Sequence, residues 1–357
     1  MGEITLHNIT KRFGQVTALK DVSFSVQDSE FFILLGPTGA GKTTTLRVIS
    51  GLEKQDEGHI LFGDQIMDQI SPAERDTAIV FQEYSLYPTM SVFDNMAFPL
   101  RSPMRSLPKQ EIRQRVEQAA ETLQITHLLE RKTAKLSGGE MQRVSIGRAI
   151  VRRPRVFLMD EPLSNLDAKM RETLRVELQH LQKEQGITTL FVTHDQIEAL
   201  TMADRIGVLN VGQLIQIGTP VEIYDHPATT FVAQLIGTPR ITLVQAERDD
   251  GFFHLLGSPV RVPVPEKVAS NLPPKFQFGI RAEDVQVVAA DHDTYSGEVA
   301  LTEPLGTHTV IHIKAGDQTL TSSQSGIASY RVGNTVHFKL NVAHAHYFDT
   351  DGVRITE

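Results

Sequence analysis

The chain has 357 residues, enough for two or three ordinary domains, and its 40% hydrophobic and 22% charged residues are typical of globular proteins. It contains no cysteine, which excludes disulfides, thiolate metal sites and redox chemistry at sulfur. Its formal net charge of −8 argues against a nucleic-acid partner, and no run approaches the ~20 apolar residues that cross a bilayer.

The first 235 residues alternate short apolar runs with helix-periodic segments, which predicts an α/β fold. Ile4–Thr10 and Val22–Val26 are predicted antiparallel strands, and Phe31–Leu35 is a predicted strand buried on both faces. Further predicted elements are strands at Thr77–Phe81, Val156–Met159 and Thr189–Thr193, and helices at Pro108–Gln124, Leu136–Ile150 and Asp167–Glu184. The last two strands end in polar residues, where open α/β sheets place their chemistry.

The sequence pattern changes after Leu235. Long amphipathic helices give way to apolar residues at every second position, as in Val260, Val262 and Val264, with turn residues between the runs. This pattern predicts a small all-β, barrel-like domain at 236–357, following an α/β domain at 1–235.

The segment Gly36–Thr43, GPTGAGKT, matches the phosphate-binding loop between a buried strand and a helix that begins near Gly41. Its glycines let backbone N–H groups converge on an anion, and a chance match is on the order of one in a hundred. Lys42 is predicted to neutralise the β and γ phosphates of ATP, and the Thr43 hydroxyl to bind Mg²⁺. The predicted nucleotide-contacting residues are Gly36, Pro37, Thr38, Gly39, Ala40, Gly41, Lys42, Thr43 and Thr44.

The strand Val156–Met159 delivers two adjacent acids, Asp160 and Glu161. Neighbouring side chains on a strand point in opposite directions, so the two carboxylates are expected to have different partners. We assign Asp160 to the Mg²⁺ shell and Glu161 to the attacking water, as general base or orienter. An acid pair at a strand end is weak evidence alone, but strong beside a phosphate loop.

Leu136-Ser137-Gly138-Gly139-Glu140 closely resembles the signature motif of ATP-binding cassette (ABC) proteins. The other motifs of that family follow in the expected order. They are Phe13, which resembles the adenine-stacking aromatic residue, Gln82 (Q-loop), Ser164–Asp167 (D-loop) and His194 (switch histidine). The resemblance implies a P-loop ATPase cassette with a helical subdomain at about 88–152, followed by an accessory β-barrel (TOBE/OB-type) domain. Outside this order, a lone histidine or glutamine after a strand would be an ordinary surface residue.

The resemblance also implies how these residues work. Ser137, Gly138, Gly139 and Glu140 would face the γ-phosphate held by a second copy, so that hydrolysis requires a dimer, and Asp167 would reach across its interface. His194 would hold the water near Glu161, and Gln82 would sense Mg²⁺ and the γ-phosphate. The most frequent signature of the family ends in glutamine. Glu140 therefore adds negative charge near the nucleotide and is expected to alter ATP affinity or turnover.

The β domain and the segment Phe81–Pro88 resemble ATPases of the carbohydrate-uptake branch, such as maltose and glycerol-phosphate importers. This resemblance implies a bacterial import motor for a carbohydrate or polyol, peripheral to the cytoplasmic face of the membrane. Its partners would be a second ATPase subunit, membrane permease subunits that dock near Tyr84–Pro88, and indirectly a solute-binding protein. Two alternatives remain open: an ATP-dependent regulatory or interaction protein, and the same motor with a polyamine, iron or anion as its load.

Overall fold

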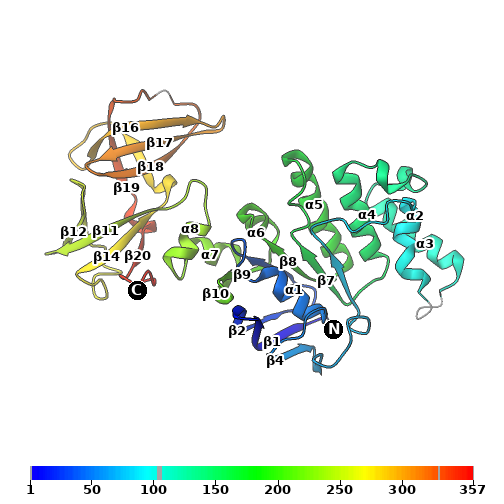
Figure 1. The fold of residues 1–357 in the computed structure, drawn as a ribbon. Coiled ribbons are helices and arrows are strands. Elements are labelled where there is room, and N and C mark those ends of the chain that lie inside the picture. Colours follow the sequence, from blue (N-terminus) through cyan, green and yellow to red (C-terminus); the bar gives the residue numbers. More distant parts are fainter. Residues whose placement is uncertain (1, 103–106, 329, 357) are drawn as a thin grey trace. The chain divides into compact units, whose positions relative to one another are not determined.

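The computed structural model describes residues 2–102, 107–328 and 330–356. The chain divides into two compact units, Met1–Pro220 and Val221–Glu357 (Figure 1). The limit expected from the sequence, after residue 235, lies beyond this division because two short helices, α7 (Pro220–Asp225) and α8 (Thr230–Leu235), fall almost wholly in the second unit. The domain limits 1–235 and 236–357 stay predictions.

A six-stranded sheet forms the centre of the first unit, in the order β10-β9-β3-β8-β7-β6. Its strands are β3 (Phe31–Leu35), β6 (Thr77–Val80), β7 (Val156–Asp160), β8 (Thr188–Thr193), β9 (Arg205–Asn210) and β10 (Gln213–Gly218). All neighbours are parallel except β9 and β10. All five residues of β3 are buried, which explains why this strand is an unbroken apolar run.

A smaller antiparallel sheet, ordered β2-β1-β4-β5, faces the larger one. It comprises β1 (Ile4–Phe13), β2 (Val16–Val26), β4 (Glu57–Phe62) and β5 (Gln65–Ile66). Helix α1 (Lys42–Ser50) contacts β7 and β8 of the larger sheet and β2 of the smaller one, so it lies between the two layers. One apolar core joins both sheets and α1.

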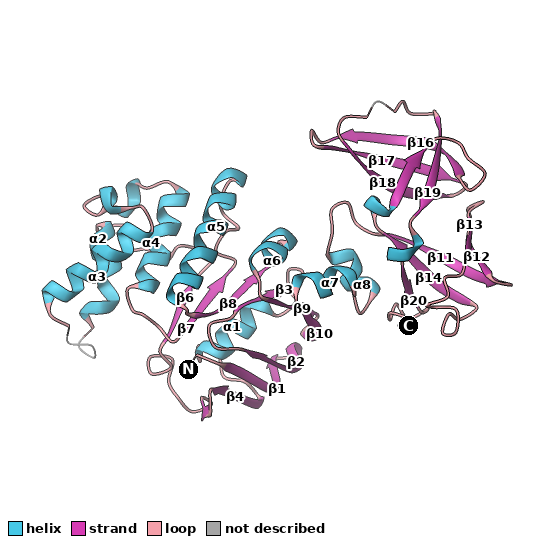
Figure 2. Ribbon diagram, turned by 180° about the vertical axis from the view of Figure 1, so that it is seen from behind, coloured by secondary structure: helices cyan, strands magenta, loops and turns pink. Residues whose placement is uncertain are grey.

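Helices cover the remaining parts of the first unit (Figure 2). They are α2 (Val92–Ala97), α3 (Lys109–Thr122), α4 (Gly138–Ile150), α5 (Ala168–Gln185) and α6 (Gln196–Met202), with 3-10 turns at Phe98–Arg101, Thr126–Leu128 and Thr133–Lys135. The predicted apolar face of α3 is buried, and the helix begins after Pro108, which has extended backbone angles. The predicted helices and parallel strands of this unit are thus confirmed, within two residues at most ends.

The second unit is β-rich, as predicted. One antiparallel sheet is ordered β13-β12-β11-β14-β20 and the other β15-β19-β16-β17-β18. The strands are β11 (Thr242–Asp249), β12 (Phe252–Leu255), β13 (Arg261–Pro263), β14 (Lys275–Ile280), β15 (Val285–Val288), β16 (Tyr295–Pro304), β17 (His308–Ala315), β18 (Gln318–Ser325), β19 (Thr335–Leu340) and β20 (His346–Phe348), with 3-10 turns at Ala282–Asp284 and Val342–His344. Side chains of β18 donate to the Val285 carbonyl of β15, so the second sheet nearly closes into a barrel.

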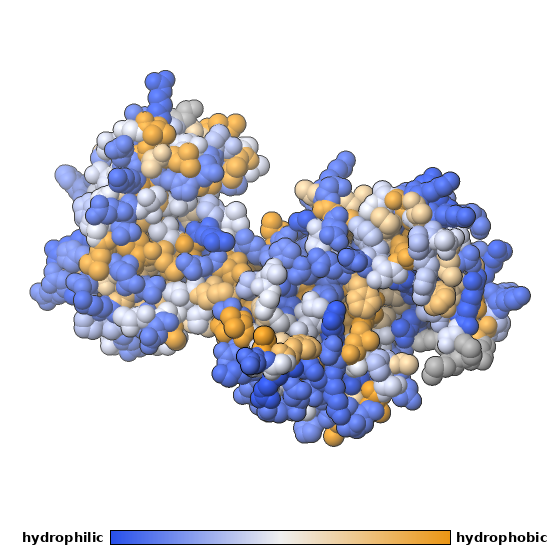
Figure 3. Space-filling model, in the orientation of Figure 1, coloured by the Kyte–Doolittle hydropathy of each residue, from blue (hydrophilic) through white to orange (hydrophobic). Residues whose placement is uncertain are grey.

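The face of the molecule seen in Figure 3 is mainly hydrophilic, with hydrophobic residues gathered in small areas. Among the residues that the structure describes, no helix is both long and apolar enough to cross a membrane.

A buried arginine caps the helix that follows the phosphate loop. Arg75 is 4% exposed and donates to the carbonyls of Val48 and Ile49 at the end of α1, at 3.0 and 2.7 Å. It also donates to the Met67 and Ile70 carbonyls at 2.8 and 3.1 Å. Burial lowers the pKa of this guanidinium. Because the last carbonyls of a helix lack intrahelical partners, Arg75 ties α1 to the following loop.

We therefore expect Arg75→Met to lower the free energy of unfolding by about 3 kcal/mol, because it leaves several carbonyls buried without donors. Chemical denaturation followed by circular dichroism measures this change. Arg113→Met on α3 is the matched control, because its exposed i,i+4 pair with Glu117 contributes at most about 0.5 kcal/mol. Equal stability of the two variants would contradict the capping role.

Candidate nucleotide-binding and hydrolysis site

The predicted phosphate loop lies between the end of β3 and the start of α1. Gly41 precedes the helix with φ of 107°, and a Cβ there would come within 2.6 Å of the Ala18 carbonyl, so only glycine fits. Lys42 is 4% exposed, and its Nζ donates to the carbonyls of Gly36 and Pro37 at 2.9 and 3.1 Å. Pro37, Thr38 and Gly39 are exposed at the loop tip, while Ala40 is buried and Thr44 half-buried.

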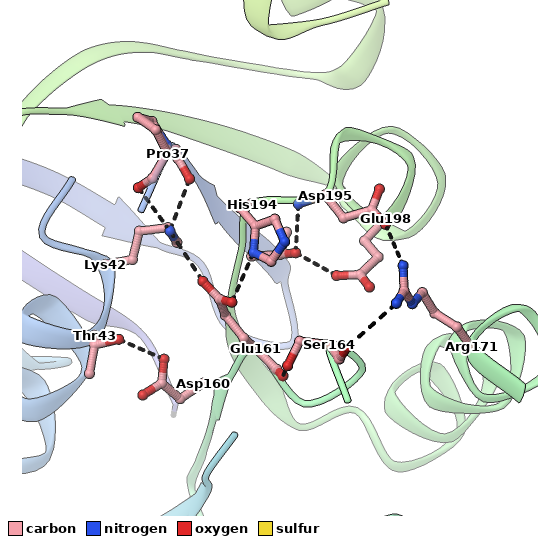
Figure 4. Close-up of polar contacts among 12 residues, drawn as sticks. Pro37, Lys42, Thr43, Asp160, Glu161, Ser164, Arg171, His194, Asp195 and Glu198 are labelled. Atoms are coloured by element: carbon pink, nitrogen blue, oxygen red, sulfur yellow. Dashed lines mark hydrogen bonds and ion pairs between the residues drawn. The ribbon is translucent and has the colours of Figure 1, made fainter. Parts of the chain in front are cut away.

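Glu161 lies between the loop lysine and the predicted switch histidine (Figure 4). Its Oε1 is 3.2 Å from Lys42 Nζ, and its Oε2 is 2.8 Å from His194 Nδ1. His194 follows β8 and is half exposed, whereas the Glu161 side chain is mostly covered. Residues remote in the sequence therefore form one line of charged and polar groups that reaches from the buried lysine toward solvent.

Asp160 and Glu161 point to different partners, as predicted, but not for the reason expected. Strand β7 ends at Asp160, and Glu161 has a left-handed φ of 44°. The backbone turn, rather than strand alternation, separates the two carboxylates. A left-handed backbone conformation costs free energy in any residue other than glycine, and it occurs where the surrounding structure imposes it. Here the Glu161 N–H donates to the Val192 carbonyl of β8 at 3.0 Å.

The other acid meets the loop threonine. Thr43 Oγ1 donates to Asp160 Oδ1 at 2.9 Å. Burial raises the pKa of Asp160, although the hydrogen bond from Thr43 opposes this shift. A hydroxyl and a carboxylate that converge in a mostly buried position provide the hard oxygen ligands that Mg²⁺ prefers.

Four of the predicted site residues lie at or just after the ends of parallel strands. Gly36 follows β3, His194 follows β8, Asp160 ends β7, and Gln82 comes two residues after β6. Adjacent parallel strands bring their carboxyl ends to one sheet edge, which is the usual ligand position in such folds. Gln82 is exposed, and its backbone carbonyl accepts a hydrogen bond from Asn165 at 2.9 Å.

The signature segment lies elsewhere, at the start of α4. Ser137 and Glu140 form a reciprocal capping box: the Ser137 N–H and hydroxyl donate to Glu140 Oε2 at 2.7 and 3.0 Å, and the Glu140 N–H donates back at 3.4 Å. The backbone hydrogen bond from Ser137 is the main cause of a lowered pKa of Glu140. Glu140 therefore has a structural reason to be acidic, since a carboxylate stabilises a helix start.

The predicted residues do not all meet within one copy. In the described part of the chain, no hydrogen bond or ion pair joins Ser137, Gly138, Gly139 or Glu140 to the phosphate loop. Asp167 caps α5 by accepting from the Met170 N–H at 3.0 Å, and it is exposed. Phe13 is 45% exposed, and Lys11 Nζ lies over its ring, 4.9 Å from the ring centre.

Sequence reasoning missed three polar residues behind the site. Glu198 on α6 is buried, Asp195 precedes that helix, and Arg171 on α5 connects Asp195 to the loop after β7. The only sequence signal for them was an acidic residue on the apolar side of a short helix. Arg171 and Asp195 lie 24 residues apart in the chain, so spacing could not reveal their contact.

Comparisons with known proteins agree with the site described above. Residues 19–164 match the ABC transporter family and residues 278–348 the TOBE domain. The trehalose/maltose import ATP-binding protein MalK of Thermococcus litoralis is 45% identical over 98% of both chains. The chain belongs to the ABC transporter ATPases. The sn-glycerol-3-phosphate import ATP-binding protein UgpC of Brucella abortus is 42% identical over the full length of both chains.

Solved structures agree with the assignment of this ABC transporter ATPase. A dimeric bacterial ABC transporter cassette is 30% identical, with a TM-score of 0.55 over 61% of this chain and 98% of that chain. A nucleotide-free cassette from an ABC transporter gives the same identity and TM-score over 60% of this chain and 90% of that chain. The predicted fold, an ABC cassette followed by a TOBE domain, is confirmed.

The capping box at Ser137 and Glu140 gives a prediction for ATP affinity. Glu140→Gln keeps a side-chain oxygen for the cap but removes a negative charge, so we expect a lower KM for ATP, by roughly two- to fivefold at low salt. Steady-state phosphate release at several ATP concentrations measures it. Glu140→Ala is the control, since it removes the charge and also the cap; an unchanged KM for the glutamine variant would show that the charge is not felt.

Proposed function

We propose that this chain hydrolyses Mg·ATP between two cassettes and so powers an importer of a carbohydrate or glycerol phosphate. The observation that carries the proposal is the contact line from Lys42 through Glu161 to His194 at the edge of the parallel sheet. It supplies a phosphate-binding cation, a base and a group that orients water, in one mostly buried place.

The residues present fit a magnesium ion. Thr43 and Asp160 would hold it, with Gln82 completing the set from the next strand end, and their oxygen atoms suit a hard cation. When bound, the ion neutralises charge on the β and γ phosphates. The elevated pKa of Asp160 fits this role, because a buried carboxylate that lacks a full counter-charge favours a cationic partner.

Lys42 and Glu161 then act in sequence. The ammonium group contacts one carboxylate and two loop carbonyls, all of which are acceptors. A triphosphate brings more negative charge to the same ammonium group, so Lys42 pairs with the phosphates in place of Glu161. The Glu161 carboxylate is then free to contact the attacking water. Glu161 takes the proton of the attacking water, while His194 holds Glu161 and the γ-phosphate in line. Phe13 stacks on the adenine ring.

The second copy supplies the signature. Ser137 and the first N–H groups of α4 form a helix start that favours an anion, but among the described residues of one copy no hydrogen bond or ion pair joins them to the phosphate loop. Gly139 packs against the Met170 side chain, and a Cβ at this position would come within 2.8 Å of it, so a larger residue would force that side chain to move. We infer that Ser137, Gly138, Gly139 and Glu140 complete the site of the partner subunit, and that Asp167 lies at the interface. The dimeric cassette among the similar structures supports this arrangement.

A groove beside the Q-loop suits a permease helix. It has a volume of about 310 Å³ and is lined by Phe81, Tyr87, Phe98, Arg148 and neighbouring residues. The Tyr87 and Phe98 rings lie 4.7 Å apart and are 40% and 45% exposed. Exposed aromatic pairs of this kind are typical of interface anchors. The groove would hold the ATPase against the cytoplasmic face of the membrane and report the state of Gln82 to the permease.

Replacing Glu161 tests the hydrolysis and dimer proposals together. Glu161→Gln should bind ATP and hydrolyse it on the order of 100-fold more slowly, so that an ATP-bound dimer accumulates. Phosphate release and light scattering measure both effects, with Glu172→Gln on the exposed side of α5 as control. Adding Ser137→Arg should leave ATP binding intact and keep the protein monomeric. Fast turnover by Glu161→Gln, or dimers of the double variant, would refute the assignment.

The load is tested with the assembled transporter. The chain is co-purified with its permease subunits, reconstituted in vesicles, and supplied with the solute-binding protein loaded with maltose, trehalose or sn-glycerol-3-phosphate. We expect ATP-dependent uptake of one of these solutes, because the full-length relatives named above import them. Uptake of a polyamine, iron or an inorganic anion instead would leave the ATPase assignment intact and overturn the proposed load.

A further inference from the structure

A buried carboxyl group lies directly behind the switch histidine. Glu198, on α6, is only 3% exposed, and its Oε2 accepts a hydrogen bond from Thr193 Oγ1 at 2.5 Å. Burying a carboxyl group is costly, and an apolar side chain would fill the same place without that cost. The carboxyl group at position 198 is therefore expected to serve through its hydrogen bond to Thr193.

One hydrogen bond joins Glu198 to Thr193, whose other contacts hold the backbone on both sides of His194. Thr193 Oγ1 donates to Glu198 and accepts from the Asp195 N–H at 2.9 Å. The Thr193 carbonyl also accepts from the Gly36 N–H at 3.3 Å, at the first glycine of the phosphate loop. His194 is the single residue between Thr193 and Asp195, so its position depends on these contacts.

Asp195 carries the link further, through Arg171, to Ser164 (Figure 4) and Leu166. Its Oδ2 accepts from Arg171 Nη1 at 3.4 Å, and Arg171 Nη2 donates to the carbonyls of Ser164 and Leu166 at 3.4 and 3.2 Å. The hydroxyl of Ser164 in turn donates to the Glu161 carbonyl at 2.8 Å. This series of contacts therefore ends at Glu161, which also contacts His194.

Helix capping alone does not explain this arrangement. Asp195 Oδ1 accepts from the Ile197 N–H at 2.7 Å, which caps α6 without any help from Glu198. The cap would remain if residue 198 were apolar. What Glu198 adds is a fixed hydroxyl at Thr193, and hence a fixed turn at His194.

We propose that Glu198 is a positioning residue for ATP hydrolysis, which holds the turn bearing His194 and joins it, through Thr193, Asp195 and Arg171, to the Ser164–Leu166 segment. The inference rests on the proposed role of His194. Movement of the Ser164–Leu166 segment at the dimer interface then reaches His194 and Glu161 together, so that hydrolysis depends on a correctly closed dimer.

The carboxyl group acts in its protonated form. Burial raises the pKa of Glu198 to about 7, against the opposing effect of the Thr193 hydrogen bond. Asp195 raises it further, while Arg171 and His194 lower it; β3 and β8, which also pack against α6, carry no titratable side chain. Above pH 7 the ionised group repels Asp195 and competes with it for Arg171. A raised carboxyl pKa also means that the associated stability, present at acid pH, is lost as pH rises through about 7.

Three variants of the full chain test the proposal. Glu198→Ala removes the hydrogen bond and should lower kcat roughly 10- to 100-fold without raising the KM for ATP. Glu198→Gln imitates the protonated acid and should restore most of that loss. The ratio of kcat for Glu198→Gln to that of the unmodified chain should rise as pH increases through 7. Glu172→Ala, on the exposed side of α5, is the control and should match the unmodified chain.

Other outcomes overturn the proposal. Unchanged kcat in Glu198→Ala would show that Glu198 only fills space, and a pH-independent ratio for Glu198→Gln would refute the dependence on the protonated form. If the alanine variant does not fold, Thr193→Val, which removes the hydroxyl with little change in shape, must show the same loss of kcat. His194→Ala separates this idea from the proposed function: full activity of that variant refutes the function itself, whereas its inactivity beside normal Glu198 variants refutes only the positioning role.

Discussion

The site depends on one buried ammonium group. Lys42 is almost fully covered, and a buried charge is stable only if nearby groups compensate it. The phosphate loop provides two carbonyls, and the end of β7 provides the carboxylate of Glu161. These acceptors hold the lysine side chain in the loop, and they are the same kind of partner that a triphosphate offers. The interaction that stabilises the lysine therefore also prepares it to exchange one anion for another.

The backbone at Glu161 is what makes this contact possible. Had the strand continued, Glu161 would have pointed away from Asp160 across the sheet, and its distance to the loop would have been set by the strand alone. Its left-handed φ instead takes the chain out of the sheet, and its N–H still bonds to β8. One carboxylate thus meets Thr43 and the other meets Lys42 and His194. The packing of the strand ends on either side compensates the conformational free energy that this backbone angle costs at Glu161.

The helix starts show how one chemical feature serves both structure and chemistry. Ser137 begins α4 and is already bonded to Glu140, and Asp167 begins α5 and is bonded to the Met170 N–H. A phosphate approaching the first helix must therefore compete with a carboxylate of the same chain. We therefore expect the acidic residue in the signature to influence ATP affinity through the same contacts that cap α4.

The sequence by itself determined the phosphate loop, the acid pair, the order of the motifs and the change from α/β to all-β, because each depends on local spacing or on unbroken apolar runs. It also predicted that the polar strand ends would meet, since parallel strands share an edge. Only the tertiary structure decided which groups touch. The bend at Glu161, the arginine at the end of α1 and the link from Asp195 through Arg171 to the Ser164–Leu166 segment depend on backbone angles or join residues that are distant in the chain. Side-chain partners of this kind are chosen by packing in three dimensions, and a one-dimensional pattern carries no record of them.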